Sequence, residues 1–350
     1  MGPPLVSIVI NNFNYARFLR QSVESALAQT HPQVEVVVVD DASSDGSREI
    51  IRSFGDRIVP VLREKNGGQA AAMNAGFAAS RGDLVIFLDA DDYLYPDAAR
   101  KAASALASGV GTIQYRLHLV DAAGKAIDVY PPPEVAFDSG NVVPKLLATG
   151  RYEGTVTSGN AFVRETLSAI VPIPVDRFRI SADGYLVTVA PFHGMVVSID
   201  EPLGAYRMHG GNLWMTGPSL ARRFRRSILH DTDKHRVLAE RAASFGLVAD
   251  SQPGLRDYQH LEVRLGSLCL EPGEHPIRSD TRIGLALHGV RSACRAPLPW
   301  RRRALLAGWF LCLGLLARPL AREVLSWYLD ASSRPKIVKR FFKLLRRLTR

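Results

Sequence analysis

The sequence is poor in cysteine and lacks any long apolar run. Its 350 residues include only three cysteines, which are too scattered to form a disulfide framework or a zinc site. No stretch of 18 or more apolar residues occurs, which excludes an obvious membrane-spanning helix. The first residues, MGPPLVSIVINNF, carry neither a charged region nor a cleavage site, so no secretory signal is expected. Together these absences favour a reducing, cytosolic compartment.

The composition is that of a folded protein with an excess of positive charge. Hydrophobic residues make up 47% and charged residues 22%, which excludes a mainly disordered chain. The length favours two or three structural units. With 44 Lys and Arg against 34 Asp and Glu, the net charge is +10. Such an excess favours an anionic partner: nucleic acid, an acidic membrane surface or a phosphorylated substrate.

The excess charge is concentrated near the C-terminus. Residues 336–350, KIVKRFFKLLRRLTR, contain seven cations and no acid, and removing these seven from +10 leaves +3 for the other 335 residues. Apolar residues recur there at i, i+4, i+7, i+8 and i+11 from Ile337, as on one face of a helix. We predict a basic amphipathic helix that lies on an anionic membrane surface. The alternatives are a helix packed on its own domain and a nucleic-acid-binding arm.

A second C-terminal segment supports the membrane interpretation. Arginines 301–303 precede fourteen apolar residues, ALLAGWFLCLGLLA, at 304–317. A helix of that length spans about 21 Å, which is short of a hydrocarbon core about 30 Å thick. An interfacial or re-entrant helix is therefore expected, and burial in a protein core is the alternative.

The first two hundred residues alternate between strand-like and helix-like patterns. Strands are expected at 5–10, 34–39, 58–62 and 84–88, and helices at 16–28, 47–53 and 69–80. This order predicts an α/β fold with a mostly parallel sheet flanked by helices. In such sheets ligands bind beyond the carboxyl ends of the strands, where this chain has polar clusters. These clusters are Asn11–Asn14, Asp40–Asp41 and Asp89–Asp92.

Beyond residue 108 the pattern is less regular. Strands are expected at 112–120, 155–163 and 195–199, a loop at 129–138, helices at 219–247 and 254–270, and a linker at 271–280. We therefore predict three parts. They are an α/β domain over 1–216, a helical region of unknown role over 217–300, and amphipathic, basic, membrane-associating helices over 301–350.

Three carboxylates follow the predicted strand at 84–88. Asp89, Asp91 and Asp92 would repel one another at the end of a buried strand, which is costly unless they are paired. A hard cation such as Mg²⁺ or Mn²⁺ prefers oxygen ligands, often shares them with substrate phosphates, and would relieve the repulsion. The alternative is a solvated acidic turn in which Asp92 caps the next helix.

A second acidic pair, Asp40 and Asp41, ends the strand at 34–39. Two strands that each end in paired acids form the pattern that a nucleotide-sugar site needs. One acid can accept a hydrogen bond from the base or the ribose, while a later acid holds a metal on the diphosphate. Phe13, at the end of the first strand, could stack on a base, or it could pack in the core.

Five motifs occur in order between residue 4 and about residue 212. They are VSIVINNFNY, VEVVVVDDASSDGS, KNGGQAAAMNAGFAASRGDLVIFLDADD, SADGYL and YRMHGGN. As an ordered set they resemble the family 2 inverting glycosyltransferases, which have the GT-A fold. The resemblance covers about 60% of the chain. It implies that the predicted domain at 1–216 is a GT-A glycosyltransferase domain.

The resemblance implies a nucleotide-sugar site at the strand ends. The first strand end and the second acidic pair would hold the base. The DxD pair, Asp89 and Asp91, would hold the metal, and Asp92 would border the sugar. The residues implied to bind the nucleotide sugar here are Asn11, Phe13, Asp41, Asn66, Gly68, Gln69, Asp89 and Asp92. Asp91, the second acid of the DxD pair, is implied to be the metal ligand.

Asp183, in SADGYL, matches the family's catalytic base. The family usually shows a Glu-Asp pair there, whereas this chain has Ala182 and Asp183. Inverting transfer needs only one carboxylate to deprotonate the acceptor hydroxyl. The loss of the acidic neighbour therefore affects how Asp183 is tuned as a base, and not the mechanism. A helix cap is the alternative for Asp183. Arg207 and His209, in YRMHGGN, resemble the basic closing motif near the diphosphate, where a cation can neutralise the leaving group.

The resemblance implies a metal-dependent inverting glycosyltransferase. We expect it to move one sugar from a nucleotide-diphosphate sugar, with UDP as the expected nucleotide, to a hydroxyl of a glycan or lipid-linked glycan. Cell-surface polysaccharide or glycolipid biosynthesis is the expected setting. The signature QxxRW of processive synthases is absent, which favours single-sugar addition.

The expected location is the cytoplasmic face of the cell membrane, with no nucleic-acid partner. A non-catalytic nucleotide-sugar-binding or scaffold protein at the membrane surface is the alternative. A nucleotidyltransferase is disfavoured because NNFNYARF, after the first strand, lacks the glycine and lysine of a phosphate-binding loop.

Overall fold

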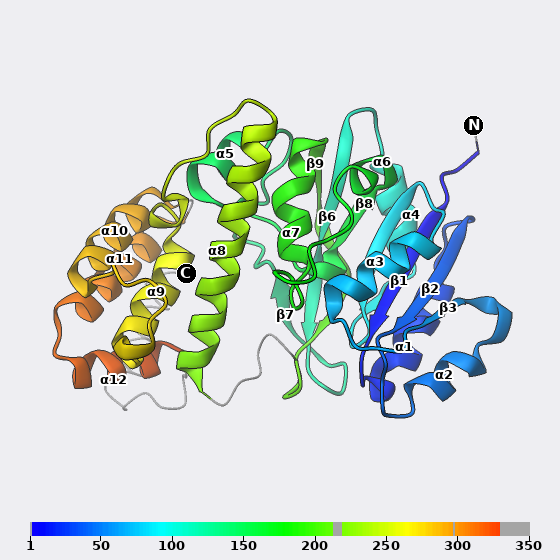
Figure 1. Ribbon diagram of the computed structural model, residues 1–350, viewed down its shortest axis with the longest axis horizontal. Coiled ribbons are helices and arrows are strands. Elements are labelled where there is room, and N and C mark those ends of the chain that lie inside the picture. Colours follow the sequence, from blue (N-terminus) through cyan, green and yellow to red (C-terminus); the bar gives the residue numbers. More distant parts are fainter. Residues whose placement is uncertain (1, 213–218, 297, 330–350) are drawn as a thin grey trace. The chain divides into compact units, whose positions relative to one another are not determined.

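The computed structural model describes residues 2–212, 219–296 and 298–329. The basic helix predicted at 336–350 lies outside these residues and stays a prediction. The chain divides into two compact units (Figure 1). The first, here called the sheet unit, comprises residues 1–147, 151–216 and 236–248, and the second, the helical unit, comprises residues 148–150, 217–235 and 249–350.

The sheet unit contains a nine-stranded mixed sheet. Its strand order is β3-β2-β1-β4-β8-β6-β9-β5, and β7 pairs with β6. The first four strands in this order are parallel, as predicted, whereas β8 is antiparallel to both its neighbours. The strands are β1 (Val6–Asn12), β2 (Val34–Asp40), β3 (Val59–Leu62), β4 (Leu84–Asp89), β5 (Tyr93–Leu94), β6 (Val110–Val120), β7 (Ala126–Tyr130), β8 (Asn160–Val163) and β9 (Met195–Arg207).

Helices cover both faces of this sheet because its central strands are apolar on both sides. Along β1, Ile8 and Ile10 belong to one apolar cluster and Val9 belongs to the other, as the two-residue period of a strand requires. The first cluster includes α1 (Ala16–Leu27), α2 (Ser47–Ser53) and α4 (Ala98–Ser104), and the second includes α3 (Gln69–Ala79), α6 (Arg164–Ser168) and α7 (Asp183–Val189). Another short helix, α5, spans Val143–Thr149.

Strand register brings the predicted polar clusters together at the carboxyl edge of the parallel strands. β1 pairs Asn12 with Asp40 of β2, and on its other side it pairs Asn11 with Asp89 of β4. The two acidic turns therefore flank the end of β1. This is the edge at which parallel sheets bind their ligands.

The structure corrects three expected elements in the second half of the sheet. β7 begins at Ala126 and forms a hairpin with β6, where the expected loop began at 129. β8 starts only at Asn160, because Thr157–Gly159 forms a 3-10 turn. β9 continues to Arg207, because its pairing with β5 and β6 extends past residue 199.

The helical unit packs four helices around one apolar cluster. They are α9 (Tyr258–Leu270), α10 (Arg282–Arg295), α11 (Trp300–Leu315) and α12 (Arg318–Leu329). The longer helix α8 (Leu220–Ser244) begins in this unit and ends in the sheet unit. α10 was not expected as a separate helix, although the Thr281 hydroxyl caps it by accepting from Gly284 N (3.1 Å).

Helix α11 contains residues 304–315 of the apolar run expected at 304–317 and ends at Leu315. Its residues Leu306, Phe310 and Leu313 are buried in the helical unit, whereas Leu311 and Leu315 are exposed. The alternative of burial in a core therefore holds for one side of the helix. For the side that faces solvent, an interfacial or re-entrant position stays a prediction. Among the described residues, no helix has both the length and the apolar character needed to cross a membrane.

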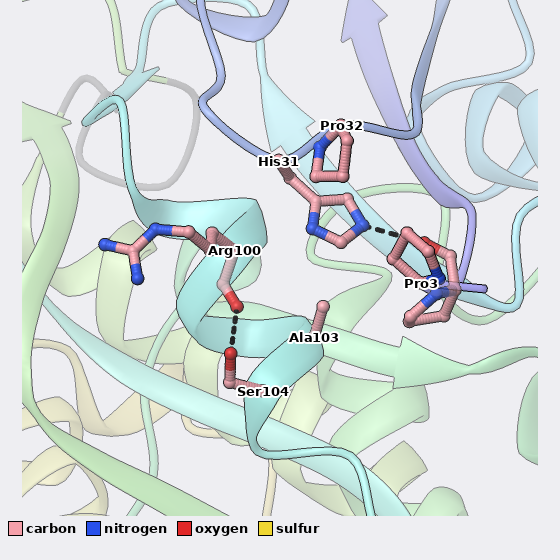
Figure 2. Close-up of a pocket in the computed structure, with 7 residues that line it drawn as sticks. Pro3, His31, Pro32, Arg100, Ala103 and Ser104 are labelled. Atoms are coloured by element: carbon pink, nitrogen blue, oxygen red, sulfur yellow. Dashed lines mark hydrogen bonds between the residues drawn. The ribbon is translucent and has the colours of Figure 1, made fainter. Parts of the chain in front are cut away.

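A pocket of about 360 Å³ lies at the amino end of β1. Figure 2 shows His31 and Pro32 on one side of it and helix α4, with Arg100 and Ser104, on the other. The imidazole Nε2 of His31 lies 2.7 Å from the carbonyl oxygen of Pro4. Because the acidic turns follow the carboxyl ends of the strands, this pocket is not part of the site described below.

Candidate active site

Asp89 ends β4 and lies between two side-chain amides. Its Oδ1 accepts from Asn11 Nδ2 (2.6 Å) and from Gln69 Nε2 (2.9 Å). Its backbone N donates to Ser158 Oγ (3.1 Å). The structure thus brings together three of the residues that the sequence predicted at the nucleotide-sugar site, Asn11, Gln69 and Asp89.

Asp92 is buried in the same turn. Its Oδ2 accepts from Ser158 Oγ (2.6 Å), and its Oδ1 accepts from the backbone N of Arg207 (2.8 Å). The next helix, α4, begins at Ala98 after Asp97. The alternative in which Asp92 caps that helix is therefore wrong, because β5 intervenes between the turn and the helix.

The carboxylates of this turn oppose one another's ionisation. Burial, together with the charges of Asp91 and Asp183, raises the pKa of Asp89 to about 7, despite the hydrogen bonds that favour its ionised form. Burial and the charges of Asp91 and Asp89 raise the pKa of Asp92 well above its usual range. A bound cation would relieve this repulsion.

Asp91, the predicted metal ligand, is oriented by the YRMHGGN segment. Its Oδ2 accepts from Asn212 Nδ2 (3.2 Å) and lies 3.0 Å from His209 Nε2. Gly211 N donates to His209 Nδ1 (3.1 Å), so in this arrangement the ring proton is on Nε2 and is donated to Asp91. The fold therefore places His209 against Asp91, more than one hundred residues away in the chain.

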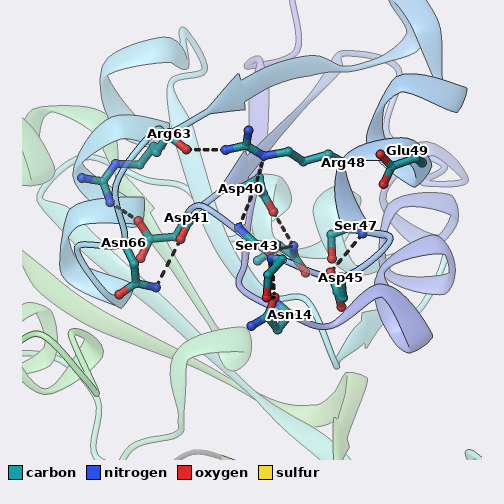
Figure 3. A network of polar contacts seen from close by, with 12 residues as sticks. Asn14, Asp40, Asp41, Ser43, Asp45, Ser47, Arg48, Glu49, Arg63 and Asn66 are labelled. Atoms are coloured by element: carbon teal, nitrogen blue, oxygen red, sulfur yellow. Dashed lines mark hydrogen bonds and ion pairs between the residues drawn. The ribbon is translucent and has the colours of Figure 1, made fainter.

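The second acidic pair begins with Asp40, which is fully buried. Its carboxylate accepts from Asn12 Nδ2 (2.9 Å), from the backbone N of Ser43 (3.0 Å) and from Arg48 Nε (3.0 Å). Figure 3 shows Ser43 and Arg48 converging on Asp40. These three donors fix the turn that follows β2.

Asp41 is bound by the loop that precedes α3. Its carboxylate accepts from the backbone N of Gly67 (3.0 and 3.1 Å) and of Gly68 (2.6 Å), and it pairs with Arg63 (Figure 3). Asn66 Nδ2 donates to the Asp41 carbonyl oxygen (3.2 Å). The predicted nucleotide residues Asp41, Asn66 and Gly68 thus form one local cluster.

Asp183 is the first residue of α7, and Ala182 occupies the cap position. The alternative in which Asp183 caps the helix is therefore wrong. Ser181 precedes them with φ +57°, a left-handed conformation that costs about 1–2 kcal/mol for a residue with a side chain. After burial and Asp91, the charge of Asp183 is a further cause of the raised pKa of Asp89. The predicted base is therefore within electrostatic reach of the acidic turn.

The guanidinium of Arg207 is buried and donates to protein acceptors through all three nitrogens. Nε donates to the Asp91 carbonyl oxygen (2.8 Å), Nη2 to Gln21 Oε1 (2.6 Å) and Nη1 to the Ala122 carbonyl oxygen (3.1 Å). The ring of Phe18 lies 4.7 Å from it. Arg207 thus holds the acidic turn in place, and its expected contact with a diphosphate stays a prediction.

Two predicted nucleotide residues, Asn11 and Phe13, lie at the carboxyl end of β1. Phe13 is 37% exposed, so the alternative in which it packs in the core is wrong. Asn11 Oδ1 is buried and has no hydrogen-bond partner among the described residues. A buried amide oxygen of this kind, beside Asp89, is suited to a cation or to a substrate hydroxyl.

The donor set fits a hard divalent cation that is shared with a substrate. Within the described parts of the chain, no group of three or more His, Cys, Asp and Glu side chains is placed to hold a metal ion by itself. Asp91 and the Asn11 oxygen are the kind of ligand that Mg²⁺ and Mn²⁺ prefer. Phosphate oxygens of a substrate commonly complete such sites.

The sequence did not reveal several residues that support the site. Asn212 lies inside the YRMHGGN motif, so the motif offered a signal for it. Ser158, which bridges Asp89 and Asp92, lies in TVTSGNAF, a stretch without any motif that we can recognise. Gln21 and Arg63 likewise carry no sequence signal, because their partners are far away in the chain.

The chain is similar in sequence to known glycosyltransferases. A family model described as glycosyl transferase family 2 matches residues 7–124. An uncharacterised glycosyltransferase of Nostoc sp. is 38% identical over 222 residues, which are 61% of this chain and 68% of that protein. The putative teichuronic acid biosynthesis glycosyltransferase TuaG of Bacillus subtilis is 38% identical over 101 residues, 28% of this chain and 40% of TuaG. The chain therefore spans less than half of TuaG.

Among solved structures, S. aureus TarS 1–349 in complex with UDP-GlcNAc is similar. The match has a TM-score of 0.53 and 16% identity, and it covers 93% of this chain and 91% of that one. At this identity the likeness concerns the fold alone. It confirms the predicted GT-A type fold, a mixed sheet with flanking helices that is followed by a helical C-terminal region.

Proposed function

Because this chain is a glycosyltransferase that belongs to glycosyl transferase family 2, we propose that it transfers a single sugar, with inversion, from a nucleotide-diphosphate sugar to a hydroxyl group. The observation that carries this proposal is that the segment with Asp183 lies close to the Asp89–Asp92 turn. Gln69 joins the two, because its Nε2 donates to Asp89 Oδ1 (2.9 Å) and its Oε1 accepts from the backbone N of Ala182 (2.9 Å), which directly precedes Asp183. The charge of Asp183 also contributes to the raised pKa of Asp89, although 94 residues separate the two in the chain. A base held near the donor's diphosphate site is what a single displacement requires.

The donor would lie along the carboxyl edge of β1, β2 and β4. Phe13 is exposed there to stack on the base, and the Asp41 cluster lies at the end of β2. A UDP-linked sugar is the proposed donor, and TarS, with a similar fold, was solved with UDP-GlcNAc. Asp92, buried in the same turn as Asp89, would border the sugar.

A divalent cation, Mg²⁺ or Mn²⁺, would be held by Asp91 together with phosphate oxygens of the nucleotide-sugar donor. When bound, it supplies positive charge to the departing diphosphate. His209 and Asn212 both contact Asp91 Oδ2, so they orient this carboxylate. Arg207 holds the backbone of the same turn through the Asp91 carbonyl.

The chemical step assigned to this chain's own residues is proton removal. Asp183 accepts the proton of the acceptor hydroxyl while that oxygen forms a bond to the anomeric carbon. The bond from the anomeric carbon to the diphosphate oxygen breaks, and its electron pair leaves with the nucleotide diphosphate. One displacement from the opposite face inverts the anomeric configuration.

The proposed acceptor is a glycan or lipid-linked glycan at the cytoplasmic face of the cell membrane. TuaG, a relative, is named for teichuronic acid biosynthesis, which supports a role in cell-surface polysaccharide assembly. The exposed side of α11 supports membrane contact, because Leu311 and Leu315 lie on it, and the same helix carries exposed Trp300, Arg301 and Arg302. Apolar and aromatic side chains beside cations suit an anionic membrane surface. The basic segment at 336–350 would add to this attraction.

The membrane proposal is tested by sedimentation with phosphatidylglycerol vesicles and with phosphatidylcholine vesicles. Arg301→Glu with Arg302→Glu should weaken binding to the anionic vesicles only. Arg52→Glu, an exposed change in the sheet unit, is the control. Equal sedimentation of the wild type with both lipids would count against an anionic membrane partner.

The enzymatic proposal is tested with a panel of nucleotide sugars, following release of the nucleotide diphosphate with and without Mn²⁺. Asp183→Asn should reduce transfer by at least roughly a hundredfold and keep donor binding, because it removes only the base. Asp176→Asn, at an exposed position seven residues earlier, is the matched control. Normal transfer by Asp183→Asn would refute the base assignment. Binding without turnover in the wild type would favour the non-catalytic scaffold.

A further inference from the structure

Gln69, the first residue of α3, joins the acidic turn to the segment that carries Asp183. Its Nε2 donates to Asp89 Oδ1 (2.9 Å), and its Oε1 accepts from the backbone N of Ala182 (2.9 Å). Ala182 directly precedes Asp183 and is fully buried. One side-chain amide therefore spans the distance between the expected donor site and the expected base.

The two partners leave only one orientation for this amide. A carboxylate oxygen can only accept, and a backbone N–H can only donate, so Nε2 must face Asp89 and Oε1 must face Ala182. Glutamine meets both requirements, because its planar amide group carries a hydrogen-bond donor and an acceptor. Glutamate would offer an acceptor to both partners, and methionine would offer neither.

Further contacts join the same two segments. Gln69 N donates to the Arg179 carbonyl oxygen (2.8 Å), and Arg179 Nη2 donates to Asn66 Oδ1 (2.5 Å). Gly68 lies so close to residue 179 that an added Cβ would be 2.4 Å from the Arg179 carbonyl oxygen. The loop before α3 and residues 179–182 therefore pack closely against each other.

We propose that Gln69 is a positioning residue for glycosyl transfer, which fixes the segment carrying Asp183 relative to the Asp89–Asp92 turn. This inference rests on the proposed function, because it assigns Gln69 a task in that reaction. Gln69 acts through other groups: it holds Asp89 on the donor side and the Ala182 amide on the base side. A shift of about 1 Å between base and donor can lower a rate about a hundredfold, so such a link matters for turnover.

The test compares Gln69→Met, which removes the hydrogen bonds of the amide to Asp89, Ala182 and Thr157 at nearly constant size, with Gln69→Glu, which keeps the acceptor for Ala182. Gln33→Met, at an exposed position, is the control. Amide hydrogen exchange at Ala182 and steady-state kinetics are measured for each. In Gln69→Met, exchange at Ala182 should rise at least roughly tenfold, because a buried amide loses its acceptor. kcat should fall roughly a hundredfold, with a smaller change in the donor KM.

Gln69→Glu should retain protection at Ala182 and still lose kcat, because its carboxylate faces Asp89. It also keeps the test available if Gln69→Met fails to fold. Unchanged exchange at Ala182 and a kcat within threefold of wild type in Gln69→Met would overturn the inference alone. A wild type without transferase activity towards any donor would instead refute the proposed function, whatever the exchange data show.

Discussion

Gly68 occupies a backbone conformation and a packing position that exclude a side chain. Its φ is +81° and its ψ is −178°, a region that is populated almost only by glycine. A Cβ there would lie 2.4 Å from the Arg179 carbonyl oxygen and 2.5 Å from Arg179 Cγ. Gly68→Ala must therefore move the backbone of residue 179, and with it the segment that leads to Asp183.

The expected loss in the free energy of unfolding has two contributions, backbone strain and the collision with Arg179. Two control variants, at Gly46 and Gly55, separate them. Gly46 has φ −74° and an open environment, so Gly46→Ala should be neutral or stabilise by about 0.5 kcal/mol. Gly55 has φ +56° and is equally open, so Gly55→Ala should cost about 1–2 kcal/mol from the backbone alone. Gly68→Ala adds the collision with Arg179, so its total cost should be about 3 kcal/mol or more.

The assay is urea unfolding of the three variants and the wild type, followed by tryptophan fluorescence and far-ultraviolet circular dichroism. Gly68→Ala should also weaken donor binding, because Gly68 N donates to the Asp41 carboxylate at 2.6 Å. If Gly68→Ala and Gly55→Ala cost the same free energy of unfolding within about 0.5 kcal/mol, the close approach to Arg179 contributes nothing. The reasoning would then be refuted.

Two further predictions concern buried polar contacts. Ser158→Ala should lower the free energy of unfolding by about 1–3 kcal/mol, because it removes a hydrogen-bond donor from the buried Asp92 carboxylate. Ser104→Ala, at an exposed position, is the control and should change the free energy of unfolding by less than about 0.5 kcal/mol. Equal effects of the two variants in thermal unfolding would contradict this prediction. Burial alone would raise the pKa of Asp280, but hydrogen bonds from His275 and Arg264 outweigh it and hold that pKa below its usual range. The resulting stability is present above about pH 4 and is lost as the pH falls through the lower, folded-state pKa, so thermal stability should fall more steeply below pH 4 in the wild type than in Asp280→Asn.

Much of the site could be predicted because its acids are local features of the sequence. Asp40–Asp41 and Asp89–Asp92 each follow a β-branched or apolar run directly, so their position at the ends of buried strands needs no tertiary information. The parallel order of β1, β2 and β4 follows from the helices between them. The irregular second half was predicted less well, because the length of β9 and the start of β8 depend on which strands pair there.

Roles that depend on distant partners could not be read in the same way. The motif marked Arg207 as a basic residue near a diphosphate, but its three nitrogens donate to Asp91, Gln21 and Ala122, each at least 85 residues away. Gln69 was predicted near the nucleotide, whereas both ends of its amide are taken by Asp89 and Ala182. A sequence shows which groups can donate or accept, but it does not show which partner lies within reach.

By itself the sequence determined the α/β class, the acidic strand ends and the ordered motifs of the family, because these depend on short-range periodicity and on residue chemistry. The tertiary structure alone decided that Ser158 bridges two carboxylates, that His209 faces Asp91, and that the segment before Asp183 is tied to Asp89 through Gln69. The physical reason is that each of these contacts joins residues 20 to 118 positions apart. Their formation depends on strand register and helix packing, which are set by the whole sheet unit.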